Sequence, residues 1–231
     1  MAMVENSYST RNWLITAVIF SALFLVIEVT DVKFLLADYI YRLEGFQWSL
    51  RDHFITKDIL HNGVRELNFV AIALVLFLTI YHYSPFGRRE KRRRYTLLLL
   101  SLLLSFGIVN YLKATLGMDC PWDLSLYGGA KPYVDFWSFR ESSFAPGRCF
   151  PAGHSSIGFS WLALYFFWKN NRITLAKFAL VSSIVVGFSL GLVQQLRGAH
   201  FFLDDITTAF ICWSVSFFIH HFGKHHEANQ R

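Results

Sequence analysis

Long runs of apolar residues recur along the chain and are separated by shorter polar segments. Six such runs can be counted, and they occupy Trp13–Ile27, Leu67–Tyr83, Tyr95–Leu112, Ser155–Trp168, Ile173–Val193 and Ile206–Phe222. A helix that crosses a bilayer needs about 20 apolar residues, so we expect these helices to extend into the polar residues that flank each run. The pattern predicts an all-α integral membrane protein, a six-helix bundle in which residues 1–231 form a single membrane domain.

The composition agrees with this interpretation. Hydrophobic residues make up 54% of the chain and charged residues 16%, against roughly 25% charged residues in an ordinary soluble domain. Mean hydropathy is +0.35. These values exclude a disordered chain, a collagen-like fibre and a disulfide-dense secreted scaffold.

Basic residues are distributed unevenly. Six of the 22 lysines and arginines lie in the seven residues Arg88–Arg94. Short loops rich in lysine and arginine face the cytoplasm, so we expect both termini on that side and the long loops in the periplasm of a bacterial inner membrane. The basic run could also contact anionic lipid; a topology signal explains it better than nucleic acid, which we do not expect as a partner. The first apolar run lacks an Ala-x-Ala exit and is expected to be a retained anchor.

Two outer segments differ in character. Asp31–Glu66, the outer amphipathic segment, is mixed in polarity and is expected to form one or two surface helices. Gly117–Pro151 is rich in glycine, proline and aromatic residues. A long irregular segment of this kind usually lines a functional site.

Three clusters of reactive residues border the outer ends of the predicted spans, and the motifs fall within about residues 113–205. They are Lys113 with the following Cys120–Asp123, the run Arg148–Ser156, and the run Gln194–Asp204. Ionisable residues at membrane depth are energetically costly, which makes them candidates for a functional site.

Some of these residues are suited to binding an anion. Ala152, Gly153 and Ser155 lie at the expected start of the fourth span, where backbone N–H groups and the positive end of the helix dipole can hold phosphate oxygens. Lys113 and an arginine would add cationic donors.

The other part suits acid–base and nucleophilic catalysis. His200 and Asp204 are four residues apart and share one helical face, so the carboxylate can orient the imidazole and leave its second nitrogen as a nucleophile. His154 supplies a second imidazole for general-acid work. Together these residues predict a phosphoryl-transfer site without a metal or other cofactor.

At these residues the chain resembles the type 2 phosphatidic-acid phosphatase superfamily of membrane lipid phosphatases. That family's pattern is Lys-x6-Arg-Pro, Pro-Ser-Gly-His and Ser-Arg-x5-His-x3-Asp. Lys113 and Cys120-Pro121 match the first part with Cys for Arg. Pro151–His154 matches the second with Ala for Ser, and His200-x3-Asp204 matches the end of the third, with Gln194 at the arginine position.

The resemblance covers about residues 95–222 and implies roles for three residues. His200 would form a phosphohistidine, His154 would protonate the leaving group, and Asp204 would orient His200. The expected function is removal of a phosphate or pyrophosphate headgroup from a phosphorylated membrane lipid. A lipid phosphotransferase using the same intermediate, or a non-enzymatic phospholipid transporter, remains as an alternative.

The two family arginines are missing from this chain. Arg197 lies one helical turn from both Gln194 and His200, and Arg148 lies just ahead of the amide groups that would hold phosphate. We hypothesise that these two arginines, together with Lys113, replace the lost pair.

A disulfide is a further expectation. Cys120 and Cys149 both fall in the outer irregular segment, whereas Cys212 lies inside the sixth apolar run. Thiols within reach of each other tend to pair in an oxidising compartment, and two buried free thiols are the alternative.

Overall fold

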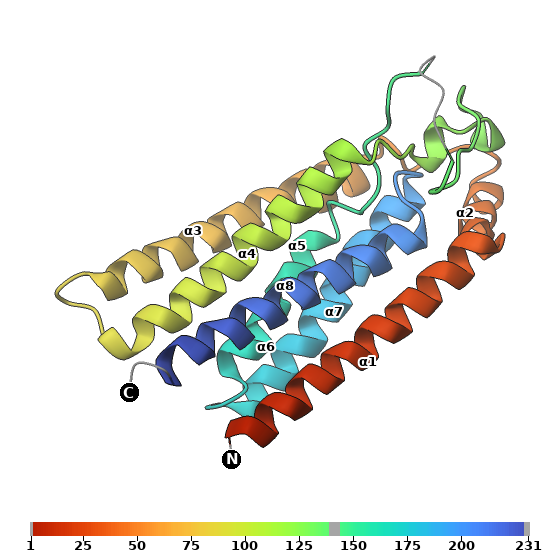
Figure 1. The fold of residues 1–231 in the computed structure, drawn as a ribbon. Coiled ribbons are helices and arrows are strands. Elements are labelled where there is room, and N and C mark those ends of the chain that lie inside the picture. The colour runs from red at the N-terminus through yellow and green to blue at the C-terminus, as the bar shows by residue number, and fades with distance from the viewer. Residues whose placement is uncertain (1, 139–143, 229–231) are drawn as a thin grey trace.

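The computed structural model describes residues 2–138 and 144–228 and shows a bundle of long helices (Figure 1). The long helices are α1 (Ala2–Val29), α3 (Val64–Tyr83), α4 (Arg89–Thr115), α7 (Ile173–Leu196) and α8 (Phe202–Ala228). The shorter elements are α2 (Val32–Leu43), η1 (Ile55–Gly63), η2 (Pro121–Asp123), η3 (Ser125–Tyr127), α5 (Ser156–Phe159), η4 (Ser160–Leu162) and α6 (Ala163–Trp168). Within the described residues, β structure is limited to one isolated bridge between Leu124 and Lys131. The all-α expectation is confirmed.

Among the described residues, five helical runs are long and apolar enough to cross a membrane. They are Thr10–Val29, Ile55–Tyr83, Arg89–Thr115, Ile173–Leu196 and Phe202–Gly223. The fourth of the six expected spans is instead the short apolar run Ser156–Trp168, formed by α5, η4 and α6. At 1.5 Å per residue this run is about 20 Å long, against about 30 Å for the bilayer core. The irregular chain ahead of Ser156 therefore has to cover the remaining depth.

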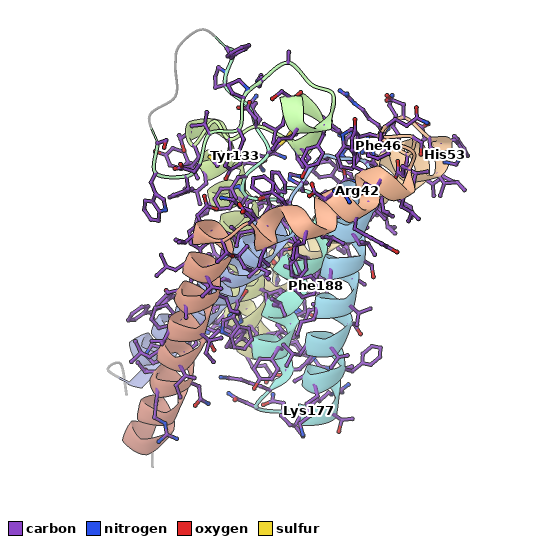
Figure 2. All side chains as sticks on the ribbon, turned by 90° about the vertical axis from the view of Figure 1, so that its right-hand side faces the viewer. Arg42, Phe46, His53, Tyr133, Lys177 and Phe188 are labelled. Atoms are coloured by element: carbon purple, nitrogen blue, oxygen red, sulfur yellow. A yellow bond between two sulfur atoms is a disulfide. The ribbon has the colours of Figure 1, made fainter. Side chains whose placement is uncertain are left out.

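The second apolar run begins earlier than the sequence pattern suggests. The π-helical turns of η1 continue into α3 without a break, because Gly63 has helical dihedrals (φ −62°, ψ −44°) and no proline occurs from Ile55 to Tyr83. Only α2 of the outer amphipathic segment forms a separate helix, and it lies across the end of the bundle (Figure 2). The polar residues of η1 are thus carried on the outer end of a long helix, where Thr56 is buried, His61 is half-buried, and Lys57 and Asp58 are exposed.

The two ends of the bundle differ. Both chain termini and the turn between α3 and α4 lie at one end, whereas α2 and the irregular segment after α4 lie at the other (Figure 1). The basic run Arg88–Arg94 starts α4 at the end that holds the termini. This arrangement agrees with the expectation that the termini and the basic loop share one side of the membrane.

The short helix α5 packs directly on the backbone of α7. A Cβ atom on Gly158 would lie 2.3 Å from the backbone nitrogen of Gly187, and one on Gly187 would lie 2.4 Å from the ring of Phe159. Such contacts are shorter than any real Cβ contact, so only glycine allows α5 and α7 to approach this closely. The approach sets the position of His154, which precedes α5.

We expect Gly158→Ala to lower the free energy of unfolding by about 1–3 kcal/mol, since the new methyl group meets backbone that cannot rotate away. The measurement is the thermal unfolding midpoint of the purified protein in mild detergent. Gly107→Ala is the matched control, because Gly107 lies inside α4 with no atom within 4 Å of its Cβ position. Equal midpoints for the two variants would contradict the proposed close packing.

Candidate active site

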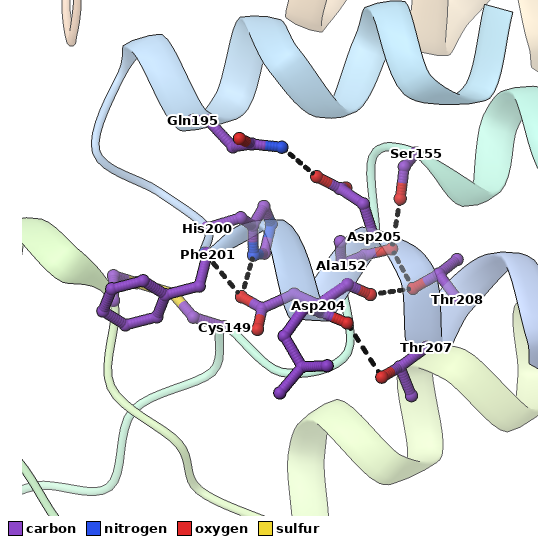
Figure 3. A network of polar contacts seen from close by, with 12 residues as sticks. Cys149, Ala152, Ser155, Gln195, His200, Phe201, Asp204, Asp205, Thr207 and Thr208 are labelled. Atoms are coloured by element: carbon purple, nitrogen blue, oxygen red, sulfur yellow. Dashed lines mark hydrogen bonds and ion pairs between the residues drawn. A yellow bond between two sulfur atoms is a disulfide. The ribbon is translucent and has the colours of Figure 1, made fainter. Parts of the chain in front are cut away.

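His200 and Asp204 form a buried pair at the start of α8 (Figure 3). Nδ1 of His200 lies 3.2 Å from Oδ2 of Asp204, and both residues are 5% exposed. The same carboxylate oxygen accepts a hydrogen bond of 3.0 Å from the backbone N–H of Phe201, the residue before the helix. An acidic side chain in the first turn that reaches back to this N–H is a common way to cap a helix. The cap holds the Asp204 carboxylate on the His200 ring.

A tight turn delivers His200 to this position. Gly198 has φ +71°, and its N–H donates to the carbonyl of Gln195, in the last turn of α7. A Cβ atom on Gly198 would lie 2.4 Å from the ring of Trp48. Both the positive φ and the contact require glycine at this turn.

Burial makes His200 a neutral imidazole. Loss of solvent lowers the pKa of His200 well below 6.5, the nearby Lys113 and His154 lower it further, and a hydrogen bond to the backbone carbonyl of Cys149 acts in the opposite direction. A hydrogen bond from Nδ1–H to an ionised Asp204 would place the proton of the neutral ring on Nδ1 and leave a lone pair on Nε2.

His154 lies at the start of the short helical run and is also buried. Burial lowers its pKa to about 4, and a hydrogen bond to Leu60 partly opposes this effect. Its Nε2 lies 2.9 Å from the carbonyl oxygen of Leu60, and its ring stacks on His61 with centroids 4.5 Å apart. A proton on His154 at neutral pH would need an anion beside it to be stable.

The segment before α5 carries the expected anion-binding residues, but Ala152 is placed differently. The Ala152 N–H donates to the carbonyl of Asp204 at 3.3 Å, so it does not point to a ligand. Its carbonyl accepts from Ser155 Oγ at 3.2 Å and from Thr208 Oγ1 at 2.9 Å. Ala152 therefore joins this segment to α8.

Lys113 and Gly153 lie in direct contact. The Lys113 ammonium lies 3.2 Å from the Cβ position of Gly153, so the absent side chain makes room for it. Among the described residues, the N–H groups of Gly153, His154 and Ser155 have no backbone acceptor. A cation and three backbone donors thus lie beside the two histidines.

The structure separates the two candidate arginines. Arg197 is 7% exposed; its Nε donates to the carbonyl of Arg51 at 2.8 Å and Nη1 donates to Oε1 of Gln194 at 3.0 Å. Its guanidinium therefore lies beside the residue that occupies the family's arginine position. Arg148 is exposed, and its charge acts on Lys113.

Cys120 and Cys149 form a disulfide, with Cα atoms 5.2 Å apart. The bridge joins the chain that follows α4 to the chain that precedes His154, and the N–H of Cys149 donates to the carbonyl of Met118 at 3.0 Å beside it. A covalent and a hydrogen-bonded link therefore hold the Lys113 end of α4 near the site.

Sequence reasoning missed two contributors to the site, Leu60 and His61. Both come from η1, which was expected to lie outside the membrane on a surface helix. A histidine and an asparagine at the outer end of an otherwise apolar helix were the available signal. Within residues 2–138 and 144–228, no group of three or more His, Cys, Asp and Glu side chains is arranged to hold a metal ion.

Comparisons with known proteins place the chain in a family and a fold. The model of the PAP2 superfamily matches residues 94–227. No curated protein sequence matches the chain significantly. The crystal structure of a transmembrane PAP2 type phosphatidylglycerolphosphate phosphatase from Bacillus subtilis is similar in fold, with a TM-score of 0.57 and 16% sequence identity. The alignment covers 94% of this chain and 96% of that one.

The buried neutral histidines predict that acid destabilises the protein. Above about pH 6.5 a histidine is neutral in both the folded and the unfolded chain. Below it the two histidines are protonated in the unfolded chain but stay neutral in the folded protein, so the free energy of unfolding falls as the pH falls. The contribution of His154 to this decline levels off below about pH 4, where the folded protein also binds the proton.

The measurement is the thermal midpoint between pH 7.5 and 4.5 in detergent without phosphate. His154→Gln removes one of the two groups and should show a shallower decline than the wild type. Parallel curves for the two proteins would contradict a neutral, buried His154.

Proposed function

The chain belongs to the PAP2 superfamily and is a membrane phosphatase, and we propose that it removes a phosphate or pyrophosphate headgroup from a membrane lipid through a phosphohistidine formed on His200. The observation that carries the proposal is the buried His200–Asp204 pair, which lies with His154, Lys113 and unpaired backbone N–H groups in one place. Each step of phosphoryl transfer then has a group suited to it.

In the first step, Nε2 of His200 attacks phosphorus. A bond forms between this nitrogen and phosphorus, and the bond between phosphorus and the leaving oxygen breaks. His154 gives a proton to that oxygen, so a neutral alcohol or a protonated phosphate departs. Asp204 stabilises the positive charge that develops on the His200 ring.

In the second step, water attacks the phosphohistidine. His154, now neutral, takes a proton from the water, the nitrogen–phosphorus bond breaks, and inorganic phosphate leaves. The cycle returns both histidines to their starting states and requires no redox partner.

Charge on the transferred group is spread over three oxygens, so fixed positive donors supply much of the catalysis. Lys113 and the N–H groups of Gly153 and Ser155 are suited to this role. Arg197 is proposed to replace the family arginine at position 194, supported by its hydrogen bond to Gln194. Arg148 is proposed as a more exposed contributor at the entrance.

The substrate is proposed to be a lipid whose tail stays in the bilayer while its headgroup enters from the outer face. The basic turn at the end of the bundle with both termini supports an inner-membrane protein with cytoplasmic termini and a periplasmic site. Phosphatidate, phosphatidylglycerol phosphate, undecaprenyl pyrophosphate and lipid A phosphates share the required chemistry. Because the protein of similar fold is a phosphatidylglycerolphosphate phosphatase, phosphatidylglycerol phosphate is the first of these lipids to test.

We expect His200→Ala to abolish release of phosphate from this lipid panel, because no other nucleophile can form the covalent intermediate. Activity of the wild type is expected to persist in the presence of a chelator. The measurement is inorganic phosphate released by the purified protein in detergent, together with trapping of the phosphoenzyme.

Four outcomes would contradict the proposal. Full activity of His200→Ala would exclude the phosphohistidine, and complete loss with chelator would indicate a metal. Transfer of the phosphate to a second lipid in place of water would indicate a phosphotransferase. Binding of a lipid phosphate without any turnover would indicate a transporter.

We expect Arg197→Ala to reduce turnover roughly 10²- to 10³-fold, as for loss of one donor to a transition-state oxygen. Arg197→Lys should recover little, since lysine lacks the planar fork of donors. Arg42→Ala, an exposed arginine at the same end of the bundle, is the matched control and should behave as wild type. Near-normal kinetics of Arg197→Ala, with an unchanged thermal midpoint, would show that another group holds the phosphate.

A further inference from the structure

Two consecutive residues of η1 hold the ring of His154 from two directions. The Leu60 carbonyl oxygen lies 2.9 Å from Nε2, at the edge of the ring. The His61 ring covers one face, with centroids 4.5 Å apart and planes inclined by 20°. These residues lie 94 and 93 positions before His154, and outside the range 94–227 that the family model matches.

The contact at the edge determines where the His154 proton sits. A carbonyl oxygen only accepts hydrogen bonds, so Nε2 of His154 must be the donor. In the neutral ring the proton is therefore on Nε2 and Nδ1 carries the lone pair. When the ring gains a second proton, Nε2–H remains on Leu60 and the new proton sits on Nδ1.

The contact on the face limits how the His154 ring can turn. An offset stack at this distance is a favourable arrangement for two aromatic rings, and an aromatic face attracts a cation placed over it. Nδ1 of His61 lies 3.2 Å from Oδ1 of Asn62, which only accepts, so the neutral His61 ring is itself held in one orientation. The stack of two oriented rings therefore restricts rotation of the His154 ring.

We propose that His61 is a positioning residue for the general acid: with the Leu60 carbonyl, it holds His154 so that Nδ1 delivers the proton to the leaving oxygen. The inference rests on the proposed phosphatase function and adds a residue to it. In the balanced step, the phosphorus–oxygen bond breaks as the bond to His200 Nε2 forms. The proton moves from Nδ1 of His154 to the departing oxygen, which leaves His154 neutral with its proton on Nε2.

A comparison of two leaving groups tests this role. Phosphatidate releases an alkyl alcohol that must be protonated as it departs, whereas 4-nitrophenyl phosphate releases a stable phenolate that does not need the proton. General-acid catalysis is worth roughly 10²- to 10⁴-fold. Both substrates pass through the same phosphohistidine, so the quantity compared is the single-turnover rate at which it forms. We expect His61→Ala to lower this rate about 10-fold on phosphatidate, a part of that factor, and to leave it nearly unchanged on 4-nitrophenyl phosphate.

Three variants accompany the measurement. His61→Phe keeps a flat ring over His154 and should recover most of the rate of phosphohistidine formation on phosphatidate. His53→Ala is the matched control, because His53 belongs to the same outer segment and is exposed. His154→Ala should show the same dependence on the leaving group with a larger loss, which identifies the acid itself.

Several outcomes would overturn the inference. An equal loss on both substrates would indicate that His61 only supports the fold, and no loss would remove it from the reaction. A His61→Phe variant as slow as His61→Ala would exclude stacking as the cause. If His154→Ala lacks the dependence on the leaving group, or if the wild type hydrolyses no phosphate ester, the proposed function fails instead.

A readout independent of turnover examines the geometry itself. Nitrogen-15 NMR of the histidine rings in the full-length protein should show neutral His154 protonated on Nε2. His61→Ala should give a mixture of the two tautomers because, without the stacked ring, His154 can turn away from the Leu60 carbonyl. A wild-type ring protonated on Nδ1, or an unchanged tautomer in His61→Ala, would contradict the inference whatever the activity measurements give.

Discussion

The docking of an irregular segment on the first turns of α8 is the constraint on which the site depends. Backbone that is not helical is tolerated at membrane depth only when protein satisfies its polar groups. Ala152 meets this requirement, since its N–H donates to Asp204 and its carbonyl accepts from Thr208 and Ser155. These hydrogen bonds place His154 beside the helix that follows His200. A regular helix satisfies its own backbone N–H and C=O groups. In that case the segment would not be bonded to α8, and nothing would fix the position of His154 relative to His200.

Burial then determines the chemistry of the groups brought together. Both His154 and His200 have lowered pKa values because solvent is excluded. In the proposed mechanism a neutral His200 can act as the nucleophile without a change of protonation, whereas His154 has to gain a proton when the phosphate binds. The negative charge of the substrate is what makes that proton stable. Binding and protonation are thereby coupled in the proposed mechanism without any moving domain.

The departures from the family motif have a structural counterpart. Cys120 stands where the pattern has arginine, and it is bonded to Cys149 in a disulfide. At the other altered position, Gln194 accepts a hydrogen bond from Arg197. One position thus serves as a covalent link, and the other lies beside the guanidinium of Arg197, one helical turn away. This exchange is visible only when the side chains are placed.

The amino-acid sequence by itself determined the helical class, the approximate positions of the membrane runs and the candidates His154, His200 and Asp204, because apolar periodicity and motif spacing are local properties of the chain. It did not reveal that η1 extends α3, that Ala152 uses its N–H to join α8, or that Leu60 and His61 hold His154. Those features arise from contacts between residues far apart in the chain, 94 positions in the case of Leu60 and His154. Only tertiary packing decides which backbone carbonyls and ring faces meet, since no local pattern encodes the partner of a group that another helix supplies.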